Sequence, residues 1–239
     1  MKKLGLFAIA ALLYSVQTEA QDVIIPQIGV KAPSFKAQST EGNINFPSDF
    51  GDHWKILVSH PKDFTPVCSS EILELAYEQG SFDDLNTKLL VVSTDIIEQH
   101  RSWKEALEEI RFQDRDPVEI RFPLVADNDL KVSKLYGMIH SASSVKENIR
   151  GVYIIDPDNI IRSIQFYPNE VGRNIDELKR TLMALQTVDE NKNLVAPVNW
   201  IPGDDMIVPV LTAEEKKMIN SPESEYYQYS WFLNYKKGM

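Results

Sequence analysis

The stretch "KILVSHPKDFTPVCSSEILELAYEQG", residues 55–80, decides how this chain folds. Its first part is a short apolar run that predicts a buried strand, and Pro61 ends that strand. Thr65 suits the position just before a helix, and Pro66 suits the first helical position, where no N–H is needed. We therefore predict a strand, a turn and then a helix that begins at Pro66 and that Gly80 ends.

The same alternation of buried strands and helices continues along the chain. Further strands are predicted at residues 88–95, 122–127, 151–156 and 160–168, and helices at 96–110, 128–138 and 174–186. Helices that alternate with buried strands imply an α/β sheet covered on both faces. The last two strands flank the turn residues "PDN" and predict an antiparallel hairpin. A hairpin followed by a helix, with Asn174 as its N-cap, is the arrangement of a thioredoxin-like fold.

The N-terminus has the features of a secretory signal peptide. Two lysines precede the apolar run "LGLFAIAALLYSV", and the small residues Thr18 and Ala20 precede Gln21 at the positions of a cleavage site. We expect residues 1–20 to be removed and the mature chain to work outside the cytoplasm, in the periplasm or the extracellular space. The apolar run is too short to span a bilayer comfortably, so no stable membrane insertion is expected after cleavage.

Net charge and length limit the partners and the domain organisation that the chain can have. The 239 residues carry a formal net charge of −10, and such an acidic chain is a poor partner for nucleic acid. The length suits one domain with a small appendage, which we place at residues 21–187 and 188–239. The appendage is proline-rich, with a short helix from about Thr212 and the aromatic end "YYQYSWFLNYKK". It is too small for a core of its own, so we expect it to pack on the main domain or on a second subunit.

Cys68 is the only cysteine in the chain. An internal disulfide is therefore impossible, and CxxC redox and zinc motifs are absent. An unpaired thiol in an oxidising compartment is either buried and inert or kept for chemistry. The first helical turn favours an anion, which here would be a thiolate. Glu71, one turn further on, opposes that anion unless an arginine serves both the carboxylate and the sulfur.

The segment "HPKDFTPVCSSEI", residues 60–72, resembles the active-site motif P-x-x-x-T-x-x-C of peroxiredoxins, in the form found in the one-cysteine, peroxiredoxin-6-like group. The segments "IGVKAPSF", "STDIIEQHRSW", "GRNIDEL" and "PVNWIPGD" resemble other parts of that family in the same order. The likeness therefore covers nearly the whole mature chain. It implies a thioredoxin-like fold with a peroxiredoxin N-terminal addition and a C-terminal extension.

The resemblance also implies the site residues. The residues that match the family's catalytic positions are Cys68 as the peroxidatic cysteine, Thr65 as the hydroxyl beside it, Pro61 as the shield of the pocket, Arg150 as the active-site arginine and Glu71 as the carboxylate that orients it. Thr65, Cys68 and Arg150 would bind the substrate, and His60 and Arg173 match residues near the pocket. Arg150 is two and four residues from Val152 and Ile154 in the same predicted strand, so the three side chains lie on one face. The Arg150 side chain is therefore expected to point inward at the edge of the sheet.

The activity implied is that of a thiol-dependent peroxidase that reduces hydrogen peroxide, alkyl hydroperoxides or both. Cys68 would become a sulfenic acid, and an external thiol, either small or on a thioredoxin-like protein, would reduce it because the chain has no second cysteine. The resemblance and the aromatic tail predict a homodimer. No cofactor is expected, and one cysteine with four scattered histidines predicts no metal site. The alternatives are a thiol hydrolase or transferase and a non-catalytic binding module on the same fold.

Overall fold

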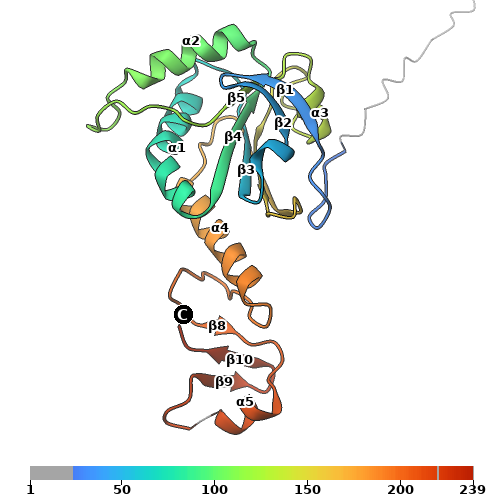
Figure 1. Ribbon diagram of the computed structural model, residues 1–239, viewed down its shortest axis with the longest axis vertical. Coiled ribbons are helices and arrows are strands. Elements are labelled where there is room, and N and C mark those ends of the chain that lie inside the picture. Colours follow the sequence, from blue (N-terminus) through green and yellow to red (C-terminus); the bar gives the residue numbers. More distant parts are fainter. Residues whose placement is uncertain (1–23, 220, 239) are drawn as a thin grey trace, which may run out of the picture.

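The computed structural model describes residues 24–219 and 221–238, so the signal peptide expected at residues 1–20 lies outside the described residues. The chain forms an α/β domain and a separate C-terminal extension, and helix α4 (Ile175–Glu190) leads from one to the other (Figure 1). Helix α4 thus runs through the boundary expected at residue 187. Within the described part of the chain, no helix is both long enough and apolar enough to cross a membrane.

The domain is built on a seven-stranded sheet with the order β2-β1-β5-β4-β3-β6-β7. Its strands are β1 (Phe35–Ser39), β2 (Gly42–Phe46), β3 (Trp54–Ser59), β4 (Thr87–Ser93), β5 (Leu124–Ala126), β6 (Arg150–Ile155) and β7 (Ile161–Tyr167). The three central strands β3, β4 and β5 are parallel, and the β6–β7 hairpin is antiparallel as predicted. The hairpin β1–β2 joins the sheet beside β5 and is the N-terminal addition to the thioredoxin-like core.

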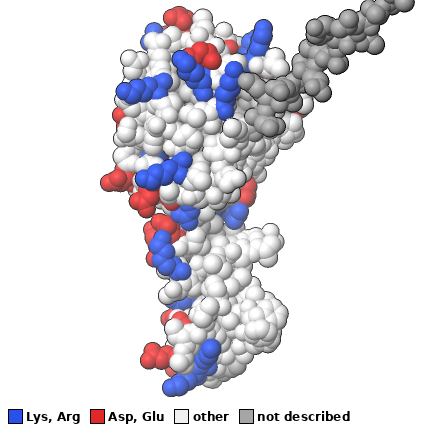
Figure 2. All heavy atoms as spheres, turned by 90° about the vertical axis from the view of Figure 1, so that its right-hand side faces the viewer, with Lys and Arg blue, Asp and Glu red and all other residues white. Residues whose placement is uncertain are grey.

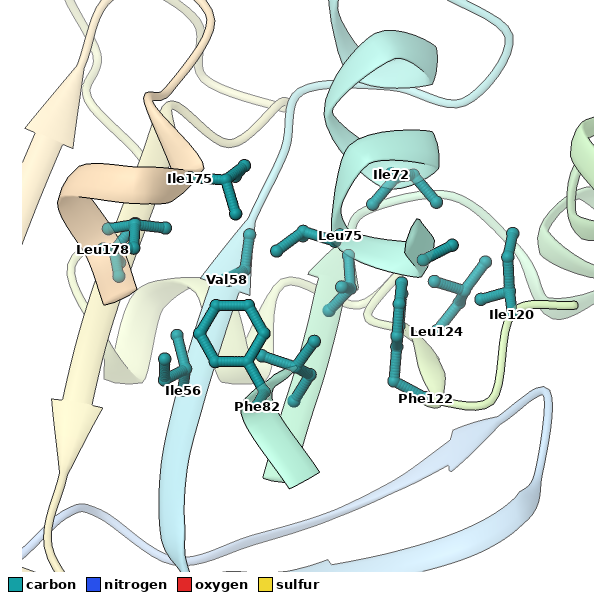
Figure 3. Packing of buried hydrophobic residues seen from close by; sticks show 14 of the residues in the cluster. Ile56, Val58, Ile72, Leu75, Phe82, Ile120, Phe122, Leu124, Ile175 and Leu178 are labelled. Carbon is teal, nitrogen blue, oxygen red and sulfur yellow. The ribbon is translucent and has the colours of Figure 1, made fainter. Parts of the chain in front are cut away.

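Helices cover both faces of this sheet, as the alternation of elements predicted. Helices α1 (Pro66–Asp84), α2 (Ile97–Glu108) and α4 share one hydrophobic cluster with strands β3, β4 and β6. Figure 3 shows part of this cluster, where Ile72, Leu75 and Phe82 of α1 lie against the sheet. Helix α3 (Lys131–Leu135) packs on the opposite face, in a second hydrophobic cluster that includes residues of β2. A short 3₁₀ turn (Ser48–Phe50) follows β2.

The prediction that Gly80 ends the first helix was wrong. Helix α1 continues to Asp84, because Phe82 lies fully buried in the core and its burial outweighs the low helix propensity of glycine. Gly80 has ordinary helical geometry and nothing within 4 Å of the place where a Cβ atom would lie.

The C-terminal extension also differs from the expectation, since it has a small core of its own. The core residues are Leu194, Trp200, Met206, Val208 and Leu211, and Met183, Ala184 and Val188 of α4 pack against them. Strands β8 (Met206–Ile207), β9 (Tyr226–Ser230) and β10 (Leu233–Lys236) form a three-stranded sheet with the order β8-β10-β9. Helix α5 (Ala213–Met218) begins at a capping box on Thr212, near the position predicted. The segment is small, but sharing one face of α4 completes its core.

Candidate active site

Cys68 lies in the first turn of α1 and is completely buried. Thr65 occupies the N-cap position and Pro66 follows it, as predicted, but the Thr65 side chain does not cap the helix. Its hydroxyl instead donates to the carbonyl oxygen of Lys62 at 2.9 Å. The first-turn N–H groups near Cys68 are therefore not consumed by that side chain, and this turn of the helix favours a negative charge on the sulfur.

Arg150 is the group that faces the sulfur. It is the first residue of β6, with its side chain on the same face of the sheet as Val152 and Ile154. Strand β6 lies between β3 and β7, so Arg150 stands at the end of an inner strand and not on an edge strand. Its Nη1 lies 3.3 Å from Cys68 Sγ and 2.6 Å from Glu71 Oε2. One guanidinium nitrogen thus contacts both the sulfur and the Glu71 carboxylate, which is the shared contact expected of an arginine from the sequence.

Glu71 is held between two buried arginines. Arg173 donates from Nε and from its backbone N–H to Glu71 Oε1 at 2.9 and 2.7 Å, and from Nη2 to Oε2 at 2.6 Å. Arg173 Nη1 donates to the carbonyl oxygens of Ser59 and Gly151 at 2.8 and 3.0 Å. The Glu71 and Arg173 side chains are only 3% and 1% exposed, so each charge depends on the other for its stabilisation.

Arg150 has a further partner that sequence reasoning missed. The backbone carbonyl of Asn169, just after β7, accepts from Arg150 Nε at 3.1 Å and from Nη2 at 2.7 Å. With the sulfur and Glu71 on Nη1, the guanidinium is fixed on two sides. No signal in the sequence could have found this contact, because a backbone carbonyl accepts in the same way from any residue type.

His60 and Pro61 are both buried at the end of β3, close to the helix start. The His60 ring lies 5.1 Å from the ring of Trp103, whose Nε1 donates to Ser69 Oγ beside Cys68. Burial, with His100 and the two site arginines nearby, holds the pKa of His60 well below its ordinary value, so this imidazole is neutral. The structure therefore gathers the predicted residues Cys68, Glu71, Arg150 and Arg173 into one network. His60 and Pro61 lie beside it at the end of β3.

A thioredoxin-like sheet that holds one buried cysteine at a helix start, facing a fixed arginine, defines the class of thiol-dependent peroxidases. The chain belongs to the AhpC/TSA family, the peroxiredoxins, whose family model matches residues 28–164. A second model, the C-terminal domain of 1-Cys peroxiredoxin, matches residues 184–221. The single cysteine fits the one-cysteine mechanism of such peroxidases.

Relatives and solved structures agree with this assignment. A peroxiredoxin of Methanosarcina mazei is 40% identical over 216 residues, which cover 89% of this chain and 98% of the relative. A 1-Cys peroxiredoxin of Dictyostelium discoideum is 38% identical and covers 81% of this chain and 78% of its own. The structure of yeast mitochondrial 1-Cys peroxiredoxin superposes with a TM-score of 0.78 at 35% identity, covering 89% of this chain and all (100%) of that one. The peroxiredoxin 6 of Arenicola marina gives 0.76 at 28% identity, covering 90% and 99%.

Proposed function

We propose that Cys68 is the nucleophile of the peroxidase reaction and that Arg150 is its main electrostatic partner. The Cys68 thiolate attacks one peroxide oxygen, the O–O bond breaks, and the other oxygen takes a proton and leaves as water or an alcohol. The sulfur is thereby oxidised to a sulfenic acid while the peroxide is reduced. The observation that carries this proposal is the 3.3 Å approach of Arg150 Nη1 to Cys68 Sγ.

The rate must come mainly from groups aimed at the two oxygens. Lowering the pKa of a thiol raises the fraction of thiolate at neutral pH only modestly, and the nucleophilicity of the sulfur falls in return. A preformed donor that meets the developing charge contributes about 10²–10³ in rate. Arg150 is such a donor, since its guanidinium is fixed by Glu71 and by the Asn169 carbonyl before substrate arrives.

The Thr65 hydroxyl can take part in this scheme as a hydrogen-bond acceptor. Because that hydroxyl already donates to the Lys62 carbonyl, only its lone pairs remain free. We propose that Thr65 Oγ1 accepts a hydrogen bond from the hydroperoxide O–H and so holds that hydroxyl oxygen toward the sulfur, while the other oxygen is the one that leaves. Pro61, buried beside the helix start, would limit water around the thiol.

The second half of the cycle needs a thiol from outside the chain. Since no second cysteine exists here or in an identical subunit, an external thiol condenses with the sulfenic acid, releasing water, and a second thiol then frees Cys68. The yeast mitochondrial relative is described as resolved through glutathione and thioredoxin systems, which supports either a small thiol or a thioredoxin-like protein as reductant. If residues 1–20 direct export, that reductant must act in the periplasm or outside the cell.

We also propose that the protein works as a homodimer through its extension. Tyr229, Trp231 and Phe232 are 73%, 85% and 65% exposed on or next to the β9–β10 hairpin. On the face seen in Figure 2, the lower lobe that forms the extension carries few charged side chains except along one edge and at its tip. Exposed aromatic groups in a patch of low charge favour a protein interface.

The decisive experiment measures peroxide reduction by single turnover. One equivalent of hydrogen peroxide or of an alkyl hydroperoxide is expected to convert Cys68 to a sulfenic acid that a dimedone-type reagent traps once per chain. Cys68→Ser should fold normally and consume no peroxide, whereas Ser69→Ala, one residue away, should keep most of the activity. Turnover at the parent rate by Cys68→Ser would refute the assignment. Cleavage of acyl esters without peroxide consumption would favour the hydrolase alternative.

A further inference from the structure

A second polar cluster lies beside the active site, and the peroxidase chemistry above does not use it. It consists of His60 after β3, Asp63 in the turn before α1, and His100 on α2. The three residues are 0%, 2% and 0% exposed. One nitrogen or oxygen atom from each lies within 4.8 Å of the others, although 40 residues separate the two histidines in sequence.

The polar atoms of this cluster are close together without being hydrogen-bonded. His100 Nδ1 lies 2.8 Å from Asp63 Oδ2, and His60 Nε2 lies 3.5 Å from Asp63 Oδ1. Neither pair is aligned as a hydrogen bond, and both His60 nitrogens, both Asp63 oxygens and His100 Nδ1 have no hydrogen-bond partner among the residues that the structure describes. A buried polar atom left unpaired costs about 1–3 kcal/mol, so five in one place require an explanation.

The tautomer of His100 suggests an explanation for these unpaired atoms. Its Nε2 lies 3.0 Å from the carbonyl oxygen of Val125, which only accepts, so the proton of the neutral ring is on Nε2. The lone pair of Nδ1 then points toward the lone pairs of the Asp63 carboxylate. A cation between the two groups would relieve the repulsion of these lone pairs, and a second proton on the His100 ring, which would make the contact an ion pair, is the alternative that the test below must distinguish. A histidine that binds a metal commonly donates its other ring N–H to a backbone carbonyl in this way.

We propose that His60, Asp63 and His100 form a binding site for a divalent transition metal ion of the zinc class. Two imidazole nitrogens and one carboxylate oxygen are ligands that zinc accepts, and three protein ligands leave a fourth position for water. Ligand atoms about 2.0–2.2 Å from a tetrahedral ion lie roughly 3.3–3.5 Å apart. The His60–Asp63 separation of 3.5 Å has this spacing, whereas the His100–Asp63 separation of 2.8 Å is shorter, so His100 and Asp63 would have to move apart by about 0.5 Å when the ion binds.

The charges around the cluster are compatible with a cation. Asp95 lies next to Asp63 and accepts its backbone N–H at 3.0 Å, so two carboxylates lie on this side. Arg150 and Arg173 are also near His60, but Glu71 already pairs with both. The ion would be structural, joining the turn that carries Pro61 and Thr65 to helix α2.

The test uses the full mature chain with Cys68→Ser, so that the thiol itself cannot bind the metal. Equilibrium dialysis against micromolar Zn²⁺ with elemental analysis should give one ion per chain, and the thermal midpoint should rise with zinc concentration. Co²⁺ should give visible d–d bands, and the chain that retains Cys68 should show no sulfur-to-cobalt charge-transfer band. Less than a tenth of an equivalent bound, or a cobalt spectrum like that of the free ion, overturns the proposal and leaves an ordinary His100–Asp63 ion pair or a buried water.

Variants locate the ion within the chain. His100→Gln and Asp63→Asn, each in the Cys68→Ser background, should bind zinc more than about 100-fold more weakly. The matched control is His53→Gln, which changes a histidine outside the cluster, and it should bind like the parent. Undiminished binding by both cluster variants would contradict the assignment. If the two variants fail to fold, the cobalt spectrum of the unsubstituted cluster still decides the question.

Discussion

At the scale of single residues, the site depends on one carboxylate shared by two arginines. Glu71 is 3% exposed and makes hydrogen bonds to both Arg150 and Arg173. Two guanidinium groups this deeply buried would be costly without that charge between them. The pairing also directs the remaining N–H of Arg150 Nη1 at Cys68, so the network that stabilises the buried charges also fixes the group that faces the sulfur.

We expect Glu71→Gln to lower the free energy of unfolding by about 3–5 kcal/mol, because it leaves two buried cations with a neutral partner. Denaturant unfolding followed by circular dichroism measures this loss. The control is Glu74→Gln on the same helix, whose ion pair with Arg115 is about one-third exposed and should contribute less than about 1 kcal/mol. Equal losses of unfolding free energy in the two variants would show that the buried Glu71 network stabilises the protein no more than the partly exposed Glu74–Arg115 pair does.

Arg150→Lys tests the role of the guanidinium in catalysis. A lysine ammonium is a point charge and cannot serve Cys68, Glu71 and the Asn169 carbonyl at once. Sulfenic acid formation should therefore slow by about 10²–10³, measured by stopped-flow under single-turnover conditions. Arg162→Lys, which changes a partly exposed arginine on β7 that pairs with Asp156 and Asp189, should react at close to the parent rate. A fast Arg150→Lys enzyme would contradict the proposed role.

At the scale of elements, helix α1 both packs in the hydrophobic core and carries Cys68. Its buried residues, Phe82 and Ile72 among them, fix the helix on the sheet, and its first turn carries Cys68. Glycine near the end of this helix is tolerated because the tertiary contacts of Phe82 hold the last turn in place.

Gly80→Ala should stabilise the protein by about 0.5–1 kcal/mol, since alanine is the better helix former and a Cβ atom meets nothing within 4 Å there. Thermal or denaturant unfolding would measure the gain. Gly137→Ala is the opposite case, because Gly137 has a φ of +61° and a Cβ atom would lie 2.7 Å from Ile25 Cγ1. That variant should be destabilised, and a loss at Gly80 would mean that the helix is strained at this position.

At the scale of the whole molecule, the extension has a core of its own but leaves its aromatic hairpin in water. Deleting the chain after Val210 would remove Leu211 from that core and the two strands that follow, so truncation would unfold the extension as well as remove a surface. Substitutions on the surface are the cleaner way to ask whether copies of this chain associate there.

We expect the double substitution Trp231→Ser and Phe232→Ser to convert a dimer into a monomer, because it removes the largest exposed apolar side chains of the hairpin. Light scattering of the purified protein across a range of concentrations gives the mass. Val198→Ser, at an 85% exposed position in the same extension but away from the hairpin, should leave the mass unchanged. A parent protein that is monomeric at every concentration would refute the dimer.

By itself the sequence determined the order of elements, the helix that begins at Pro66 and the position of the single thiol, Cys68, in its first turn. These are local properties: apolar periodicity, the proline at the first helical position and a single thiol are all visible in short windows. The resemblance to peroxiredoxins added Arg150 and Glu71, whose contact spans 79 residues and whose pairing no local pattern gives.

Only the tertiary structure decided the rest, because the remaining features depend on contacts between distant segments. The length of α1 depends on where Phe82 is buried, and the core of the extension depends on one face of α4. The Asn169 carbonyl reaches Arg150 only because β7 pairs with β6. His60 lies three residues before Asp63 in the sequence, but only the fold brings His100, on α2, to the two of them. Burial and proximity are properties of the packed chain, so no spacing along the sequence could have supplied them.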